Sequence, residues 1–140
     1  MKTIANRLIV FAASAIAFGT VAFGQTRMTA EIPFAFRTVS GTLPAGNYEV
    51  RETSAGGALH IVSLWNTATQ KGAFAGNPTY NAYRKTSGGT SLEFLCVERN
   101  CSLKAIRSVD ASLEYPTPSK SKDDSKVAVV TIPVKLVNAD

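Results

Sequence analysis

The sequence predicts an all-β protein, a small antiparallel β-sandwich or barrel-like domain that follows a cleaved signal peptide. Short apolar segments recur along the chain, and clusters of Gly, Pro, Asn and Ser separate them. No segment after residue 24 keeps the 3.6-residue apolar period of an amphipathic helix. The only two cysteines, Cys96 and Cys101, have the spacing of partners across a tight hairpin.

The N-terminus has the pattern of a secretory signal. Two basic residues precede an uncharged apolar run at residues 8–23, and small residues occupy positions 22 and 24. We therefore expect cleavage before Gln25, so that residues 1–24 are the signal peptide. Residues 25–140 then form a single exported domain in the periplasm or outside the cell. An uncleaved membrane anchor is the alternative, because the run is only slightly shorter than the roughly 20 residues that span a bilayer.

Charge and hydropathy argue against two classes of function. The chain has 15 basic and 10 acidic residues, and loss of Lys2 and Arg7 with the signal changes the net charge from +5 to +3. Such a small excess does not predict nucleic-acid binding. No later apolar run is long enough to predict a membrane span in the mature chain.

Export and spacing together predict a disulfide between Cys96 and Cys101. Exported proteins fold in compartments that permit disulfides. The four residues between the cysteines rule out C-x-x-C redox and haem motifs. A structural zinc site needs about four ligands, and His60 is the only histidine. We expect no metal and no cofactor, and a disulfide that stabilises its small loop by about 2 kcal/mol.

The predicted disulfide implies a hairpin register. If residues 97–100 form the loop, Cys96 faces Cys101, apolar residues share one face, and charged residues share the other. The further predicted pairs are Phe94 with Leu103, Leu92 with Ala105, and Glu93 with Lys104.

Two strands and a turn are predicted near the mature N-terminus. Apolar residues alternate over residues 28–36, and Pro33 indicates that this strand lies at an edge or pairs only after the proline. Pro44 and Gly46 match the second and fourth places of a type I turn. We expect a hairpin over residues 32–52.

Further strands follow at short intervals. Residues 58–65 are apolar at nearly every position, which predicts a strand covered on both faces. The remaining predicted elements are short segments at residues 72–75 and 80–84, a weaker strand at 107–115, an exposed polar loop at 116–126, and a last strand at 127–137 in which Pro133 indicates an edge or a bulge.

Residue types suited to catalysis are few, so we predict no catalytic residue and no enzyme. A serine or cysteine nucleophile normally needs a histidine base. His60 lies within an apolar strand, where we expect it to meet a polar partner or solvent. Paired carboxylates could serve a hydrolase, and the candidate pairs are Glu49 with Glu52 and Glu93 with Glu98.

Aromatic residues beside polar groups are the best indication of ligand binding. The candidate binding residues are Trp65, Tyr80, Tyr83 and Arg84. Rings with adjacent polar groups can hold a sugar or an aryl ligand. In the alternative interpretation, Trp65 caps the core and the tyrosines cover a sheet edge.

Two short motifs give the chain a resemblance to known proteins. IPFAF at residues 32–36 is followed by LPAGNYEV at residues 43–50. With the N-terminal signal, they resemble a group of short exported bacterial proteins of unknown function. In that group an [IV]-P-F-x-F strand precedes an L-P-A-G-x-Y-x-V turn and strand. The resemblance implies a small exported β-protein and supplies no site residues.

Three functions remain open. The first is a binding or structural module that meets an envelope protein or a glycan through a flat face or an edge. The second is a carrier of a small apolar ligand, with a cavity lined by residues such as Phe34, Trp65 and Phe94. The third is a hydrolase with two carboxylates within roughly 10 Å of each other in a cleft. The oligomeric state also remains open.

Overall fold

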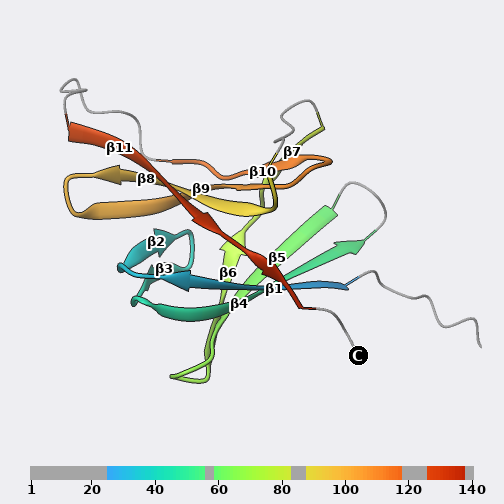
Figure 1. Cartoon of the computed structure of the whole chain (residues 1–140), viewed down its shortest axis with the longest axis horizontal. Coiled ribbons are helices and arrows are strands. Elements are labelled where there is room, and N and C mark those ends of the chain that lie inside the picture. The colour runs from blue at the N-terminus through green and yellow to red at the C-terminus, as the bar shows by residue number, and fades with distance from the viewer. Residues whose placement is uncertain (1–24, 56–58, 83–87, 118–125, 138–140) are drawn as a thin grey trace, which may run out of the picture.

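The protein folds as two β-sheets packed face to face, which confirms the predicted all-β class (Figure 1). The computed structural model describes residues 25–55, 59–82, 88–117 and 126–137. Within this part of the chain there are twelve strands and no α-helix. The predicted signal peptide, residues 1–24, lies outside the described residues.

Sheet A has five antiparallel strands. Their order across the sheet is β12 (Lys135–Leu136), β1 (Gln25–Ile32), β4 (Gly46–Ala55), β5 (Leu59–Asn66) and β6 (Lys71–Gly76). Side chains alternate along each strand. In β1, β4 and β5 the buried residues are the even-numbered ones, so these face sheet B and the odd-numbered ones face outward.

Sheet B has seven strands. Its main path is β11 (Val127–Pro133), β8 (Ser91–Val97), β9 (Asn100–Arg107), β10 (Ser112–Glu114) and β7 (Thr79–Asn81). A short hairpin of β2 (Phe36–Thr38) and β3 (Gly41–Leu43) lies beside the start of β9. Among the described strand pairs, β2 and β9 run parallel, whereas the others are antiparallel. The strand predicted at residues 107–115 is wrong as one element, because β9 ends at Arg107 and β10 begins at Ser112.

Pro33 divides the strand predicted at residues 28–36. β1 ends at Ile32, and the chain crosses to sheet B, where β2 begins at Phe36. A proline has no N–H for the ladder, so the strand pairing stops there. β1 and β4 do pair, with Ile32 opposite Gly46, but the β2–β3 hairpin is inserted between them. The prediction of one hairpin over residues 32–52 is therefore wrong, because β1 and β4 are not joined by a single turn.

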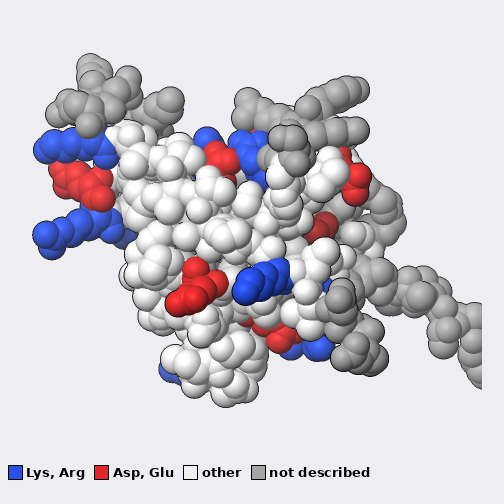
Figure 2. Space-filling model, in the orientation of Figure 1, with Lys and Arg blue, Asp and Glu red and all other residues white. Residues whose placement is uncertain are grey.

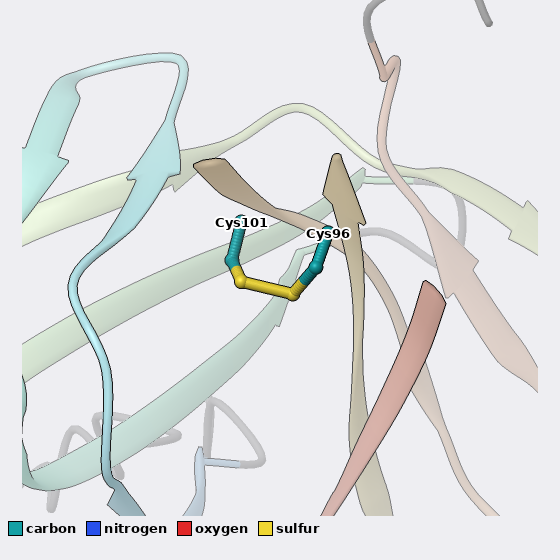
Figure 3. Close-up of a disulfide and its surroundings, with 2 residues drawn as sticks. All are labelled: Cys96 and Cys101. Atoms are coloured by element: carbon teal, nitrogen blue, oxygen red, sulfur yellow. A yellow bond between two sulfur atoms is a disulfide. The ribbon is translucent and has the colours of Figure 1, made fainter. Parts of the chain in front are cut away.

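The β8–β9 hairpin contains the predicted disulfide (Figure 3). The Cα atoms of Cys96 and Cys101 are 4.0 Å apart, slightly below the usual lower limit of about 4.4 Å. The predicted pair of Phe94 with Leu103 is confirmed. A bulge beyond this pair makes the other two predicted registers wrong, because Leu92 faces Ile106 and Glu93 faces Ala105. The opposite-charge contact expected between Glu93 and Lys104 nevertheless forms. The shift places Ile106 opposite Leu92, where both are buried.

β5 is buried on only one face, contrary to the prediction for residues 58–65. Val62 and Leu64 point into the core, whereas Leu59 and Ile61 are 48% and 37% exposed. The described strands form two layers, and no described strand covers the outer face of sheet A. Half of this apolar run fills the core, and the other half makes an apolar outer surface.

The C-terminal segment joins the two sheets. β11 pairs along β8 at one edge of sheet B, and β12 pairs with β1 at one edge of sheet A (Figure 1). The single strand predicted at residues 127–137 is therefore two strands. The break follows Pro133. The expected edge position of this proline is confirmed, because β11 is an edge strand of sheet B. Residues 118–125 of the predicted exposed loop lie outside the described residues.

Aromatic rings fill the space between the sheets. Phe94 is fully buried, and the rings of Phe34 and Phe36 each lie 5.2 Å from it in edge-to-face contact. Tyr48 contacts Phe36 in the same manner at 5.4 Å, and its hydroxyl donates a 2.6 Å hydrogen bond to the carbonyl oxygen of Pro44. Edge-to-face pairs add to the stabilisation that burial provides.

Candidate functional site

Trp65 lies on the outer face of sheet A. It is an odd-numbered residue of β5 and sits between Glu49 of β4 and Gly72 of β6. A Cβ atom at Gly72 would lie 2.6 Å from Cε3 of the indole, so the ring covers the glycine. The absence of a side chain at Gly72 thus lets the indole lie over β6. The interpretation of Trp65 as a core cap is wrong.

Two apolar side chains extend the surface around Trp65. Phe74 of β6 is 64% exposed and lies opposite Ser63 of β5. It is therefore a diagonal neighbour of Trp65 on the same face of the sheet. Ile61 points to the same side, four residues before Trp65 on β5. We call Trp65 and Phe74 the aromatic platform, and Ile61 extends its apolar surface along β5. Exposed apolar residues that cluster in this way commonly mark an interaction surface.

A strip of charged side chains borders the aromatic platform on β1 and β4. The Arg51 Nε atom lies 2.7 Å from Glu49 Oε1, and Arg27 Nε lies 3.2 Å from the same oxygen. The hydrogen bond from Arg51, together with the two positive charges, lowers the pKa of Glu49 below its ordinary value. We call Arg27, Glu49 and Arg51 the polar strip, and the lowered pKa keeps Glu49 ionised at neutral pH.

Tyr80 lies far from this surface in the strand order. It belongs to β7, at an edge of sheet B, where it faces Leu113 of β10. Its ring stacks on that of His60 in sheet A, with centroids 4.8 Å apart and planes within 3°. Trp65 and Tyr80 therefore belong to different sites. The other two candidate binding residues, Tyr83 and Arg84, lie outside the described residues.

His60 has a polar partner, as the sequence predicts. Its Nδ1 atom lies 2.8 Å from Glu52 Oε1, and its side chain is only 11% exposed. Both residues are even-numbered, so they lie on the face of sheet A that looks toward sheet B. Glu52 thereby orients His60, and His60 supports Tyr80.

Glu52 and Tyr80 border a hollow at one end of the sandwich. It has a volume of about 270 Å³ and is bordered by Glu52 and Tyr80 together with Asp110 of the turn between β9 and β10. We call it the end cleft. A larger groove of about 620 Å³ lies where the C-terminal segment crosses, and Glu31 and Lys135 of opposite charge line it.

The carboxylate pairs predicted for a hydrolase do not form in the structure. Glu49 points outward and Glu52 inward from β4, so they lie on opposite sides of sheet A. Glu93 is held by Arg107 and Lys104. Glu98 pairs instead with Lys126, at 3.3 Å. Glu49, Glu93 and Glu98 are thus each held by lysine or arginine side chains, and Glu52 by His60.

The three residues predicted to line an apolar carrier cavity, Phe34, Trp65 and Phe94, do not lie around a common space. Phe34 and Phe94 contact each other within the packed core. Trp65 lies on the other side of sheet A. These three rings therefore line no common cavity.

Sequence reasoning did not identify three residues of these two sites. Only the pairing of β6 with β5 brings Phe74 diagonally next to Trp65. Ile61 lies on the same strand as Trp65, but the sequence did not show that this face is exposed. Asp110 lies in a turn, and only the packing of the sheets brings it to the same cleft as Glu52. A signal for Phe74 did exist, because KGAFAG places one aromatic residue among small ones.

Charges of both signs are mixed on the visible face of the described residues (Figure 2). Figure 2 shows acidic and basic side chains interspersed on the face in view, with a broad uncharged area between them. No group of three potential metal ligands occurs within the described residues. In the same part of the chain, we found no helix with the length and hydropathy of a membrane span. No protein-family model, curated protein or solved structure matches this chain.

Proposed function

We propose that this protein is an exported binding module that recognises a glycan through the outer face of sheet A. One observation carries the proposal: the indole of Trp65 lies over Gly72, and the exposed Phe74 is its diagonal neighbour on the same face of the paired strand β6. The polar strip of Arg27, Glu49 and Arg51 lies on the adjoining strands.

The aromatic platform and the polar strip match the two kinds of surface that a sugar presents. The faces of a pyranose ring carry C–H groups, which pack against the faces of aromatic rings. Its hydroxyl groups accept and donate hydrogen bonds, and ionised Arg and Glu side chains form the stronger bonds of this kind. Both surfaces lie on paired strands, which hold side chains more rigidly than loops do.

Export is part of the proposal and places the glycan in the cell envelope or outside the cell. Two features support it: the signal-like pattern of residues 1–24 and the disulfide between Cys96 and Cys101. Disulfides of this kind are typical of proteins outside the cytoplasm. An envelope protein is the competing partner, because an exposed apolar cluster also suits a protein interface.

Fluorescence of Trp65 tests the proposal directly. Trp65 is the only tryptophan of the chain, so its emission reports on the aromatic platform alone. We would titrate the purified protein with peptidoglycan fragments and with soluble neutral and acidic polysaccharides. A saturable change in emission with at least one glycan is the expected result. We expect Phe74→Ala to weaken that binding about fivefold, by loss of one aromatic contact.

A matched control is available on the other sheet. Val129 of β11 is 52% exposed and apolar, so Val129→Ala should leave glycan binding unchanged. If no glycan changes the emission of Trp65, the glycan assignment is wrong. A second measurement compares the envelope proteins that co-purify with the wild type and with Phe74→Ala. If Phe74→Ala loses a co-purifying envelope protein but binds glycan as the wild type does, the glycan assignment is also wrong, and a protein partner is favoured.

A further inference from the structure

The end cleft has a lining that differs from the outer face of sheet A in its charge. Two carboxylates, of Glu52 and Asp110, border it. No lysine or arginine of the described residues does so. The whole chain has a basic excess, so this local acidic lining is opposite in sign to the net charge. A cationic ligand would meet the carboxylates of Asp110 and Glu52 here, the second of which also contacts His60.

Apolar and aromatic side chains form the rest of the wall. Met28 and Leu113 lie deep in the cleft and are buried. Leu136 and Tyr80 line its mouth and are 60% and 48% exposed. Exposed apolar side chains that converge on a hollow beside charged groups are typical of a ligand site. This wall suits a ligand with an apolar body.

Tyr80 is held in place before any ligand arrives. One face of its ring lies against His60, and His60 is bound to Glu52. The series of contacts crosses from β7 of sheet B to β5 and β4 of sheet A, so both sheets support it. A preoriented aromatic ring near carboxylates attracts ammonium groups through the negative charge of the ring face.

We propose that the end cleft binds a small primary amine, with its ammonium group at Glu52 and Asp110 and its apolar body against Met28, Leu113 and Tyr80. A primary ammonium has three N–H donors. Thr26 and Thr90 also line the cleft, and a threonine hydroxyl oxygen can accept a hydrogen bond. Ser108 lines it too, but its hydroxyl already bonds the backbone of Ala111. The volume of about 270 Å³ is smaller than that of most drug-sized pockets and suits one small molecule. This proposal does not depend on glycan binding, because the two sites share no residue.

A pair of ligands that differ in charge tests the proposal. We would titrate the purified protein with 2-phenylethylammonium and with uncharged 2-phenylethanol by calorimetry at pH 8, where histidine side chains are normally neutral. Saturable binding of the ammonium, and at least about threefold weaker binding of the alcohol, are the expected results. Binding of the ammonium should also weaken in high salt, because salt screens the carboxylates.

Variants locate the binding in the cleft. Asp110→Asn removes one charge from an exposed turn, and Tyr80→Leu removes the ring from a half-exposed position. Each should weaken binding about threefold. Glu98→Gln is the control, because Glu98 lies in the β8–β9 turn and pairs with Lys126. The proposal is overturned by equal binding of the alcohol and the ammonium, by no binding of either, or by binding that Asp110→Asn and Tyr80→Leu leave unchanged.

Discussion

Lys104 Nζ lies 2.8 Å from Glu93 Oε1, although the strand register places Ala105 opposite Glu93. The bulge in the β8–β9 pair accounts for this relationship, because it keeps Lys104 close to Glu93 while Ile106 turns toward the core. The Arg107 guanidinium bonds the other carboxylate oxygen of Glu93. Glu93 is buried, so these two partners are what make its ionised form tolerable in the sheet.

This ionic cluster predicts a loss of stability in acid. The hydrogen bond from Arg107, followed by the bond from Lys104, lowers the pKa of Glu93 from 4.5 to about 2. The pKa of Glu93 is lower in the folded state than in the unfolded state. Ionised Glu93 therefore contributes its full share to the free energy of unfolding above about pH 5, and this contribution declines as the pH falls toward 2. We expect Glu93→Gln to reduce the free energy of unfolding at pH 7 by about 2 kcal/mol, and much less at pH 2.

Urea unfolding of both proteins between pH 2 and pH 7 measures this difference. Glu98→Gln serves as the matched control, because Glu98 and Lys126 are both 60% exposed and their pair contributes little. A difference between wild type and Glu93→Gln that is constant with pH would contradict the assignment.

Tyr48 and Tyr115 form a matched pair for testing buried hydroxyl groups. The Tyr48 hydroxyl donates to Pro44, whereas the Tyr115 hydroxyl is buried without a partner among the described residues. Burial, and to a lesser degree the charge of Glu52, raise the pKa of Tyr115 above its ordinary value. We expect Tyr48→Phe to destabilise the fold by about 1 kcal/mol and Tyr115→Phe to be neutral or stabilising. Thermal unfolding compares them, and equal destabilisation would show that Tyr115 has a partner.

Gly72 predicts how the indole of Trp65 is seated. A Cβ atom there would lie 2.6 Å from Cε3 and 3.1 Å from Cζ3 of the ring, so Gly72→Ala must displace the ring. We expect a shifted emission maximum of Trp65 and weaker glycan binding in the fluorescence titration. The far-ultraviolet circular dichroism spectrum should stay unchanged. Gly89→Ala is the control, since nothing lies within 4 Å of the added atom. Unchanged emission in Gly72→Ala would mean that the ring does not rest on this residue.

Mass spectrometry of protein from its native compartment tests export and disulfide together. We expect a chain that begins at Gln25, is two hydrogen atoms lighter than the dithiol, and resists alkylation without reductant. A mass that retains residues 1–24 would instead indicate a membrane-anchored domain. Two alkylatable thiols would contradict the disulfide and leave Cys96 and Cys101 open to another role.

Local patterns in the sequence determined much of the secondary structure. Alternation and breakers predicted the strands that became β1, β4, β8, β9 and β11, because side-chain period and turn chemistry act over only a few residues. The pair of Cys96 and Cys101 was readable for the same reason. Trp65 and Tyr80 were recognisable as aromatic residues beside polar ones, but their locations were not.

Tertiary structure decided where these segments meet. The transfer of residues 36–43 to sheet B, the bulge after Glu93, and the crossing after Pro133 each depend on contacts between distant parts of the chain. A single added residue in one strand reverses which side chains face the core. For this reason, only the folded protein separates Trp65 and Phe74 on the outer face of sheet A from Tyr80 and Glu52 in the end cleft.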